Sequence, residues 1–554
     1  MVNFLTCISL TFLFYLLQLS YVYTLGILIL LVPFFFLVRL YQKLKSRMEN
    51  LEGNIDFTRQ ELFRITGNHK NLRVREPWEY PESIRNHPLS IDLDLCNKYG
   101  FFSYLDTTVT KQGFQEFLNV FLKNDVAGNK EILERQSFIK GISEKKYKAY
   151  LLLKFFHLKI REPQIKSEGN VFVNPISFWK GNFRRILVYL FPILSVFTPL
   201  YGIISLLFDL PLLPLLLFCN GMIFLSYRKE SLRTWKEIAK LSSTASEFSK
   251  LILYVSKEKR TTKKQLKQIT SLGDSYEILI SPLPHIILNV LFFWDLWKIR
   301  KFSQWIHHYG EVWNQKWTEI VKLDSVSPFV NDSFLHREYN FPNLTETNTL
   351  KASQITHPLL PKEKSVFNPL TEIHPGDLVV ITGSNMSGKT TYLRSVAVSL
   401  LLARAGSKVC GTSFEFMPFQ IHTLIRSQDS LEDGVSFFYS EVRRLADILN
   451  SANSESHIPI LFLDEILKGT NSKERYIATR ELLFALREKG AIVFVTTHDL
   501  KLSEIPWAKQ FHFTELEVNG RMEFDYKIRP GVSTSTNALK ILKKEGIPIR
   551  NEEV

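Results

Sequence analysis

The hydrophobic positions of the chain fall into two patterns. Two long runs carry almost no charge, whereas the last third of the chain alternates short apolar runs with amphipathic stretches. Residues 4–38 contain no charged side chain, and Asp209 is the only charge within residues 186–226. Because a membrane-spanning helix needs about 20 apolar residues, each run is long enough for a hairpin of two short spans. The pattern therefore predicts transmembrane hairpins at residues 1–40 and 183–228.

Basic residues flank both apolar runs. Arg39 and Lys43 follow the first run, and Arg185 and Arg228 lie on either side of the second. Under the positive-inside rule, both ends of each hairpin face the cytoplasm, which predicts a multi-pass protein of the inner membrane. A cleaved signal peptide is the rival interpretation of the first run, but no basic segment precedes it. A buried helical pair in a large domain is the alternative for the second run.

The segments outside these runs have the composition of folded domains. We interpret residues 41–90 as a helical linker on the cytoplasmic side. Residues 91–182 and 229–350 follow largely helical patterns, and we interpret them as two parts of one domain. In residues 351–554, apolar runs of strand length alternate with amphipathic stretches, which is typical of an α/β domain. A set of tryptophans at helical spacing predicts a packed helix face rather than a base-stacking platform; these are Trp294, Trp297, Trp305, Trp313 and Trp317.

A glycine-rich turn follows the first buried strand of the α/β region. Leu378 to Ile381 form an apolar run, and a helical pattern continues from Thr391 to about Ala405. Between them the sequence fits G-x-x-x-x-G-K-[ST], in which backbone N–H groups and a helix N-terminus surround a phosphate chain. We expect ATP to bind at Gly383, Ser384, Asn385, Met386, Ser387, Gly388, Lys389, Thr390 and Thr391. The predicted fold class is therefore an α/β P-loop ATPase domain plus a mainly α-helical domain, with two transmembrane hairpins.

Two further apolar runs provide the other groups that such a site needs. Residues 458–463 are followed by Asp464 and Glu465. We expect Asp464 and the Thr390 hydroxyl to hold Mg²⁺, while Lys389 contacts the β- and γ-phosphates and Glu465 polarises the attacking water. His498 follows the next apolar run, at a strand end where α/β sheets bind ligands, so we expect it to contact the γ-phosphate. An Asp-Glu pair or a histidine after a strand is common, and the combination with the phosphate loop is what makes these assignments specific.

Ser436 opens a helical stretch that continues through Arg443 and Leu445. Serine is a preferred helix N-cap, so a purely structural role is one interpretation. The functional alternative is that the Ser436 hydroxyl and the helix N-terminus face the nucleotide of a second subunit. Ser436 therefore joins Glu465, His498 and Lys389 as a catalytic candidate.

The net charge and the spacing of the cysteines limit which partners and which compartment the sequence predicts. The formal net charge of +14 suits an anionic partner, either nucleic acid or the inner face of a membrane, although part of the excess simply flanks the apolar runs. The four cysteines lie far apart, with neither metal spacing nor a C-x-x-C pair, which fits a reducing compartment.

Together these motifs resemble those of the MutS-type mismatch-repair ATPases, a branch of the ABC class. The matching segments are His357-Pro358, Asn368-Pro369, Asn385-Met386, Ser436 with Glu441, Asp464-Glu465 with Gly469-Thr470, Thr497-His498 and Tyr526 to Gly531. Upstream, residues 105–113 and 134–136 resemble the helical lever domain of that family. The resemblance implies ATP hydrolysis with Mg²⁺, DNA as a partner, ATP-driven lever movement, and a homodimer in which Ser436 completes the site of the other subunit.

The sequence also departs from the family pattern. No segment before residue 91 resembles the mismatch-reading domain, the chain ends soon after Ile547-Pro548 without the family's helical dimerisation extension, and Lys468 stands where many members have a small residue or arginine. We therefore predict a membrane-anchored MutS-type ATPase coupled to DNA binding. One alternative is an ABC-type membrane ATPase that drives transport or rearrangement, although no Leu-Ser-Gly-Gly signature is present. Another is a structural or signalling module in which ATP sets dimerisation.

Overall fold

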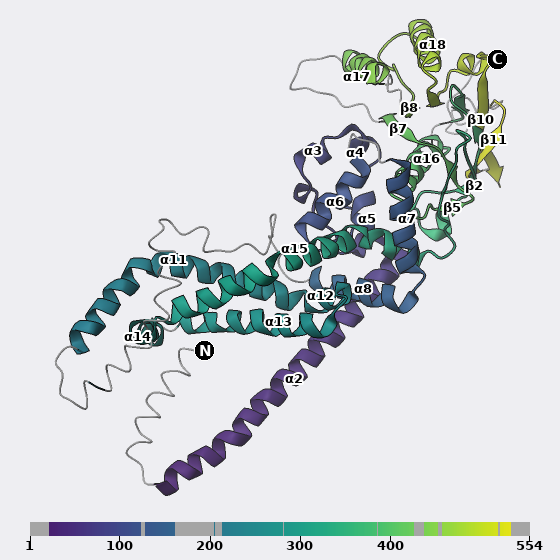
Figure 1. Cartoon of the computed structure of the whole chain (residues 1–554). Helices are drawn as coiled ribbons and strands as arrows, with labels where there is room; N and C mark the ends of the chain where they lie inside the picture. Colours follow the sequence, from purple (N-terminus) through teal and green to yellow (C-terminus); the bar gives the residue numbers. More distant parts are fainter. Residues whose placement is uncertain are drawn as a thin grey trace. The chain divides into compact units, whose positions relative to one another are not determined.

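A computed structural model gives two compact units that interleave along the chain (Figure 1). Unit 1 comprises Met1–Asn54, Thr110–Gln112 and Arg161–Leu323, and unit 2 comprises the remaining residues. The structure describes residues 21–122, 128–160, 204, 213–280, 282–384, 386–425, 437–451, 457–518 and 521–532. Helices α2 (Tyr21–Ile65), α6 (Lys111–Leu122) and α15 (Trp294–Leu335) contribute residues to both units.

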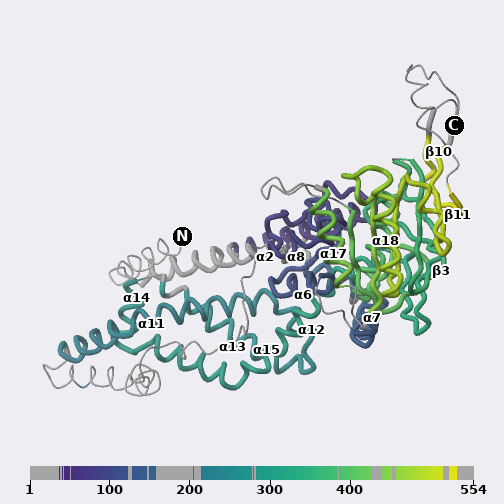
Figure 2. The backbone as a smooth tube through the Cα atoms, turned by 90° about the horizontal axis from the view of Figure 1, so that it is seen from above, coloured from purple at the N-terminus to yellow at the C-terminus, as the bar shows by residue number. Residues whose placement is uncertain are grey.

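Unit 1 is helical where it is described. Besides parts of α2 and α15, it contains α11 (Leu213–Glu247), α12 (Ser249–Val255), α13 (Lys259–Asp274), η4 (Ser275–Ile280) and α14 (Pro282–Phe292). Helix α11 packs against α13 and α14, and Figure 2 shows α11, α13 and α15 running side by side. Trp305, Trp313 and Trp317 of α15 are buried, which confirms the packed face predicted from their spacing, whereas Trp297 is exposed.

The prediction of membrane hairpins is wrong. Among the residues that the structure describes, no helix combines the length and the apolar composition that crossing a membrane requires. In α11 the apolar part, residues 213–227, is shorter than the ~20 residues of a span, and the helix continues into a charged segment. Helix α2 likewise continues past residue 40 without a break, and its later part carries many charged side chains. The predicted location, a multi-pass protein of the inner membrane, depended on these hairpins and is therefore wrong as well.

Parts of both hairpin predictions fall on residues 1–20, 183–203 and 205–212, which lie outside the described residues. An apolar run in a sequence can form a membrane span, or it can form the first part of a longer helix that continues into a charged segment. The sequence pattern could not distinguish these two cases.

The helical part of unit 2 packs around the end of α15. Its further elements are η1 (His69–Asn71), η2 (Pro77–Glu79), α3 (Glu82–Arg85), α4 (Pro88–Asp92), α5 (Phe101–Leu105), α7 (Asn129–Ser143) and α8 (Lys146–Ile160). Helix α5 is buried along its whole length. The Tyr104 hydroxyl donates to Asp332 at 3.0 Å, and Thr107 and Ser327 hydroxyls lie 2.9 Å apart. These bonds fasten α5 and the segment after it to α15.

The α/β part of unit 2 contains two sheets. The smaller sheet comprises β1 (Asn343–Leu344), β2 (Leu350–Ile355), β3 (Asn368–Ile373), β5 (Gly411–Thr412) and β6 (Glu415–Phe416), with η5 (Lys362–Lys364) between β2 and β3. The larger sheet has the order β11-β10-β4-β9-β8-β7. Its strands are β4 (Leu378–Thr382), β7 (Phe419–Leu424), β8 (Ile458–Asp464), β9 (Ile492–Thr496), β10 (Ala508–Val518) and β11 (Arg521–Pro530).

The larger sheet is parallel except for β11, which pairs with β10 in the antiparallel sense. Strands β4 and β9 are buried at every position, as expected for parallel strands covered on both faces. Helix α16 (Lys389–Arg404) is buried along most of its length. Helices α17 (Phe437–Ser451) and α18 (Ser472–Glu488) and the short η6 (Leu500–Glu504) complete the region. Leu445 of α17 and Leu483 of α18 belong to one apolar cluster with Leu461 and Val493 of the sheet.

A buried polar network holds α11, α14 and α15 together in unit 1. Asp295 is fully buried and accepts hydrogen bonds from Ser231 at 2.6 Å and Trp235 at 3.0 Å. His285 Nε2 lies 2.9 Å from the same carboxylate, and Asn289 accepts from the Asp295 backbone N–H. Since a buried carboxylate is costly unless it is paired, this network fixes how the three helices pack.

We predict that Asp295→Ala destabilises unit 1 by about 3 kcal/mol or more, because three buried donors lose their acceptor at once. Urea unfolding followed by tryptophan fluorescence measures this loss. Asp274→Ala, which removes an exposed aspartate at the end of α13, is the matched control and should change stability by no more than about 0.5 kcal/mol. Equal unfolding midpoints for the two variants would show that the network contributes nothing.

Candidate active site

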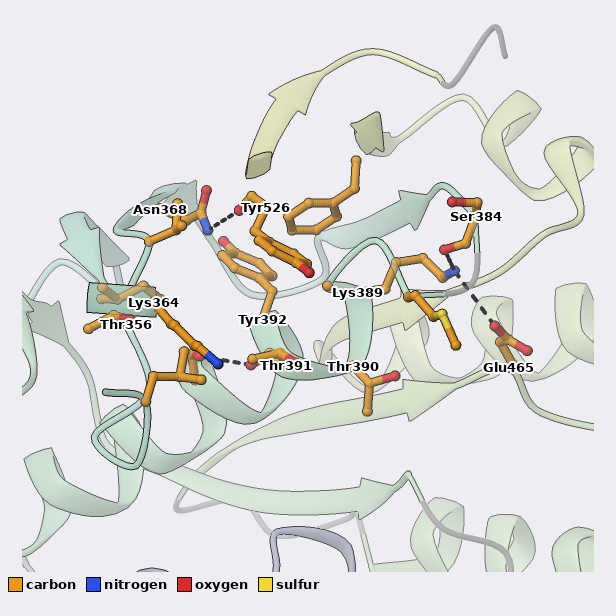
Figure 3. A pocket seen from close by; sticks show the side chains of 17 residues that line it. Thr356, Lys364, Asn368, Ser384, Lys389, Thr390, Thr391, Tyr392, Glu465 and Tyr526 are labelled. Carbon is orange, nitrogen blue, oxygen red and sulfur yellow. Dashed lines mark hydrogen bonds and ion pairs between the residues drawn. The ribbon is translucent and has the colours of Figure 1, made fainter. Parts of the chain in front are cut away.

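The parallel register of β4, β9 and β8 brings three motifs to one edge of the sheet. Ile381 pairs with Thr496, and Thr496 pairs in turn with Asp464. The residues that follow these strands therefore emerge side by side: the phosphate loop after β4, Glu465 after β8 and Thr497-His498 after β9. A pocket of about 440 Å³ opens there, within the range of small-molecule sites (Figure 3).

The loop between β4 and α16 has the backbone shape that a phosphate cradle needs. Gly383 and Gly388 have φ angles of +138° and +107°, which side chains disfavour. A Cβ at Gly383 would also meet the Phe513 carbonyl at 2.7 Å. The Ser387 hydroxyl donates to the Ser384 carbonyl at 2.8 Å and closes the turn. The buried Ser384 hydroxyl lines the pocket and has no hydrogen-bond partner among the described residues, which suits an oxyanion ligand.

Lys389 is the first residue of α16 and is 4% exposed. Its ammonium group donates to the carbonyls of Gly383 and Ser384, both at 2.8 Å, and lies 3.8 Å from Glu465. Burial lowers the pKa of Lys389, while the nearby carboxylates of Glu465 and Asp464 oppose this shift. The lysine is thus held over the loop as a cation, at the N-terminus of a helix that also favours anions.

Thr390 and Asp464 meet at the floor of the site. The Thr390 hydroxyl donates to Asp464 Oδ2 at 2.7 Å, and the Thr496 hydroxyl donates to the other carboxylate oxygen. One hydroxyl and one carboxylate beside a phosphate site are the oxygen ligands that Mg²⁺ takes, because this ion keeps several waters and uses few protein groups. The donor set therefore fits the predicted metal.

Glu465 lies between a lysine and a histidine side chain. Its Oε1 is 2.8 Å from His498 Nε2, and its Oε2 is 2.8 Å from Lys468 Nζ. The hydrogen bond with His498, followed by that with Lys468, lowers the pKa of Glu465 to about 2 against the opposing effect of burial. Glu465 and Leu467 both adopt positive φ, of +48° and +59°. Non-glycine residues in this conformation cost about 1–3 kcal/mol each and gather at functional sites.

Aromatic side chains form the other wall of the pocket, and none of them was assigned to the site from the sequence. Tyr392, Phe513 and Tyr526 line it, and in Figure 3 Lys389 lies between Tyr526 and Glu465. Asn368 fixes the backbone beneath Tyr526, because its amide donates to the Tyr526 carbonyl at 2.9 Å and accepts from the Ile528 N–H at 2.8 Å. No periodicity marks these residues, since Tyr392 lies on α16, Phe513 on β10 and Tyr526 on β11, and only the folded chain brings them together.

Two predicted residues cannot be compared with the structure. Asn385 of the loop and Ser436 lie outside the described residues. Glu441, quoted with Ser436, is buried on α17, and burial raises its pKa. Met386, in contrast, is 85% exposed. The structure thus brings Gly383, Ser384, Ser387, Gly388, Lys389 and Thr390 together with Asp464, Glu465 and His498, and Thr391 and Met386 also line the pocket.

We predict a pH-dependent contribution of Glu465 to folding stability. Its pKa is about 2 in the folded protein and 4.5 ordinarily, so the ionised carboxylate stabilises the folded state above pH 4.5, and this contribution disappears as the pH falls through about 2. The difference in unfolding temperature between the wild type and Glu465→Gln should therefore be steady near neutrality and shrink between these two pH values. A difference that stays constant throughout this interval would contradict the ion pairs.

Comparison with known proteins gives matches in this region of the chain. The family model described as MutS domain V matches residues 379–551. A protein named DNA mismatch repair protein MutS from Natronomonas pharaonis is 32% identical over 200 residues, which are 35% of this chain and 23% of that protein. A protein of the same name from Thermus thermophilus is 31% identical over 233 residues, 41% of this chain and 28% of that protein. The chain thus spans about a quarter of the length of these relatives.

Proposed function

Residues 379–551 belong to the MutS family, and on that premise we propose that the protein binds and hydrolyses ATP and couples this cycle to DNA. The observation that carries the ATPase proposal is the convergence of Lys389, Thr390 and Glu465 on one pocket, with Asp464 hydrogen-bonded to Thr390. These are the groups that phosphoryl transfer to water requires: a cation for the phosphates, metal ligands and a base.

Each side chain takes one role in this proposal. Lys389 and the loop N–H groups bind the β- and γ-phosphates, and Tyr526 offers its ring to the base of the nucleotide. Thr390 and Asp464 would hold Mg²⁺, which would supply charge neutralisation at the phosphate oxygens. Glu465 orients and deprotonates the attacking water.

The charge environment of Glu465 suggests how hydrolysis is restrained. Both carboxylate oxygens of Glu465 are already engaged, one by Lys468 and one by His498 at 2.8 Å each, so neither is available to an attacking water. We infer that the γ-phosphate draws His498 and Lys468 away from Glu465. The carboxylate oxygens are then free to accept a hydrogen bond from the attacking water only when ATP is bound.

Replacing Glu465 by glutamine should abolish ATP turnover, with a loss of about a hundredfold or more, while ATP still binds. Binding and steady-state hydrolysis are measured on the same preparation. Glu481→Gln on the exposed face of α18 is the matched control and should hydrolyse ATP at the wild-type rate. Undiminished hydrolysis by Glu465→Gln would exclude Glu465 as the base.

We further propose that the protein acts as a homodimer through this region, with Ser436 of one subunit at the nucleotide of the other. Support comes from the resemblance of the Ser436 segment and from the helical pattern that follows Ser436 in the sequence. A helix N-terminus is a suitable donor group for phosphate oxygens.

The DNA part of the proposal is supported by a basic face on α13. The buried face of this helix packs against α11 through Leu266 and Ile269. Its opposite face exposes a row of cationic side chains that are suited to DNA phosphates; with the residue two positions before the helix these are Lys257, Lys259, Arg260, Lys263, Lys264 and Lys267.

We predict that the combined variant Lys263→Gln, Lys264→Gln and Lys267→Gln binds duplex DNA more weakly and with a shallower salt dependence. Each lost phosphate contact lowers the slope of log K against log salt by about 0.9, so three contacts lower it by about 2 to 3. Fluorescence anisotropy with a labelled duplex over a salt series measures both quantities.

An equal charge change elsewhere provides the control for this experiment. Lys130→Gln, Lys140→Gln and Lys145→Gln remove three exposed lysines on and just after α7 in unit 2. This variant should retain the wild-type slope. The same slope for both triple variants, or no salt-sensitive binding by the wild type, would remove α13 as the DNA-binding face.

A further inference from the structure

A second cavity of unit 2, of about 370 Å³, lies at the opposite end of α16 from the phosphate loop. Lys389 is the first residue of this 16-residue helix and Arg404 the last, so the two sites are about 24 Å apart along it. Elements α4, α6, β7 and α17 also contribute to the cavity. It shares no lining residue with the first pocket.

Arg404 presents an uncompensated positive charge to this cavity. The residue is 6% exposed, and one of its terminal nitrogens donates to the Phe121 carbonyl. Its Nε is buried without a hydrogen-bond partner, and no ion pair with a carboxylate is found for Arg404 among the described residues. The charged group that acts on it is Arg135, which has the same sign; with burial as the larger cause, the pKa of Arg404 falls to about 10.

Other cationic or imidazole groups line the same cavity. His422 of β7 has a buried Nε2 that has no partner among the described residues, and Arg444 of α17 donates to Asp92 at 2.5 Å and to the Thr423 carbonyl at 2.8 Å. His87 lies beside them, and after burial the positive charges of Arg404 and Arg444 are what lower its pKa. Asp447, the acidic residue of the lining, is exposed.

These polar groups stand beside an apolar wall that includes Leu89, Phe121 and Ile421. The Arg444 charge already has the Asp92 carboxylate, whereas no described carboxylate pairs with Arg404. A buried guanidinium without a counter-charge is expensive, and arginine matches phosphate and carboxylate oxyanions through several parallel hydrogen bonds. The volume exceeds that of an inorganic anion and lies near the lower limit of small-molecule sites.

We propose that this cavity binds a small organic anion, whose phosphate or carboxylate group pairs with Arg404 and His422 and whose apolar body rests on the Phe121 side. The site is separate from the proposed ATP site. Because Arg404 ends the helix that begins at Lys389, an occupant contacts an element that leads to the proposed ATP site.

Isothermal titration of the full chain with inorganic phosphate, phenyl phosphate and benzoate tests this proposal. Phenyl phosphate should bind more tightly than inorganic phosphate, because only its ring reaches the apolar wall. Arg404→Met should weaken binding at least tenfold, as expected for the loss of a charge-assisted hydrogen bond. Benzoate tells a carboxylate site from one that requires phosphate.

The controls separate this cavity from the phosphate loop. Arg487→Met removes an arginine that stacks on Trp507 of unit 2 and does not line the cavity, so it should bind the probes as the wild type does. Lys389→Ala should also retain binding. If binding is lost in Lys389→Ala and kept in Arg404→Met, the anion occupies the phosphate loop and the proposal is wrong, although the proposed ATP site then stands.

A second variant covers the case in which Arg404→Met does not fold. His422→Phe keeps an aromatic ring on β7 and removes the buried nitrogen, and it should weaken phenyl phosphate binding several-fold. Unchanged affinity in folded His422→Phe, or no heat with any of the three probes up to about 10 mM, overturns the proposal.

Discussion

The parallel pairing of three buried strands is the constraint on which the nucleotide site depends. Strand β9 pairs with β4 on one side and with β8 on the other, and in both pairings Thr496 lies opposite the last residues before a motif. Because the carboxyl ends of parallel strands share an edge, Lys389, Glu465 and His498 meet although they are far apart in the sequence. A shift of one residue in either register would turn every side chain of the strand to its other face. Strands β4 and β9 are buried at every position, so such a shift would require the side chains on both faces of the sheet to repack.

The arrangement of charged side chains determines which chemistry this edge of the larger sheet can support. Three cationic or imidazole groups and two carboxylates lie within a few ångströms, and Glu465 faces Lys468 and His498 at equal distances of 2.8 Å. Its low pKa follows from those two partners. Lys468, which stood out in the sequence only as a departure from the family pattern, is therefore one of the two groups that restrain the proposed base. At the far end of α16 the balance is different, because Arg404 has no opposing charge among the described residues.

The sequence predicts features that depend on neighbouring residues better than features that depend on contacts between distant parts of the chain. The phosphate loop, the strand before it and the Asp464-Glu465 pair could be predicted because each depends on local spacing. The wall formed by Tyr526 and Asn368 could not be derived in that way, since it requires β11 and β3 to meet across about 160 residues, a separation given by the hydrogen bond between Ile528 and Asn368. The membrane prediction was wrong because an apolar run shows length and composition but not where its helix ends, and α2 and α11 both continue into charged segments. The hydrogen-bond network around Asp295 likewise could not be predicted from the sequence pattern.

The most direct measurement is the isothermal titration of the full chain with Mg·ATP, compared between the wild type and Lys389→Ala. We expect the wild type to bind one nucleotide per chain, and Lys389→Ala to bind it about ten to a hundred times more weakly, since the variant loses a charge-assisted contact to the phosphates. Absence of binding by the wild type, or equal affinity in the two proteins, would contradict the assignment of the pocket at the end of β4 as an ATP site.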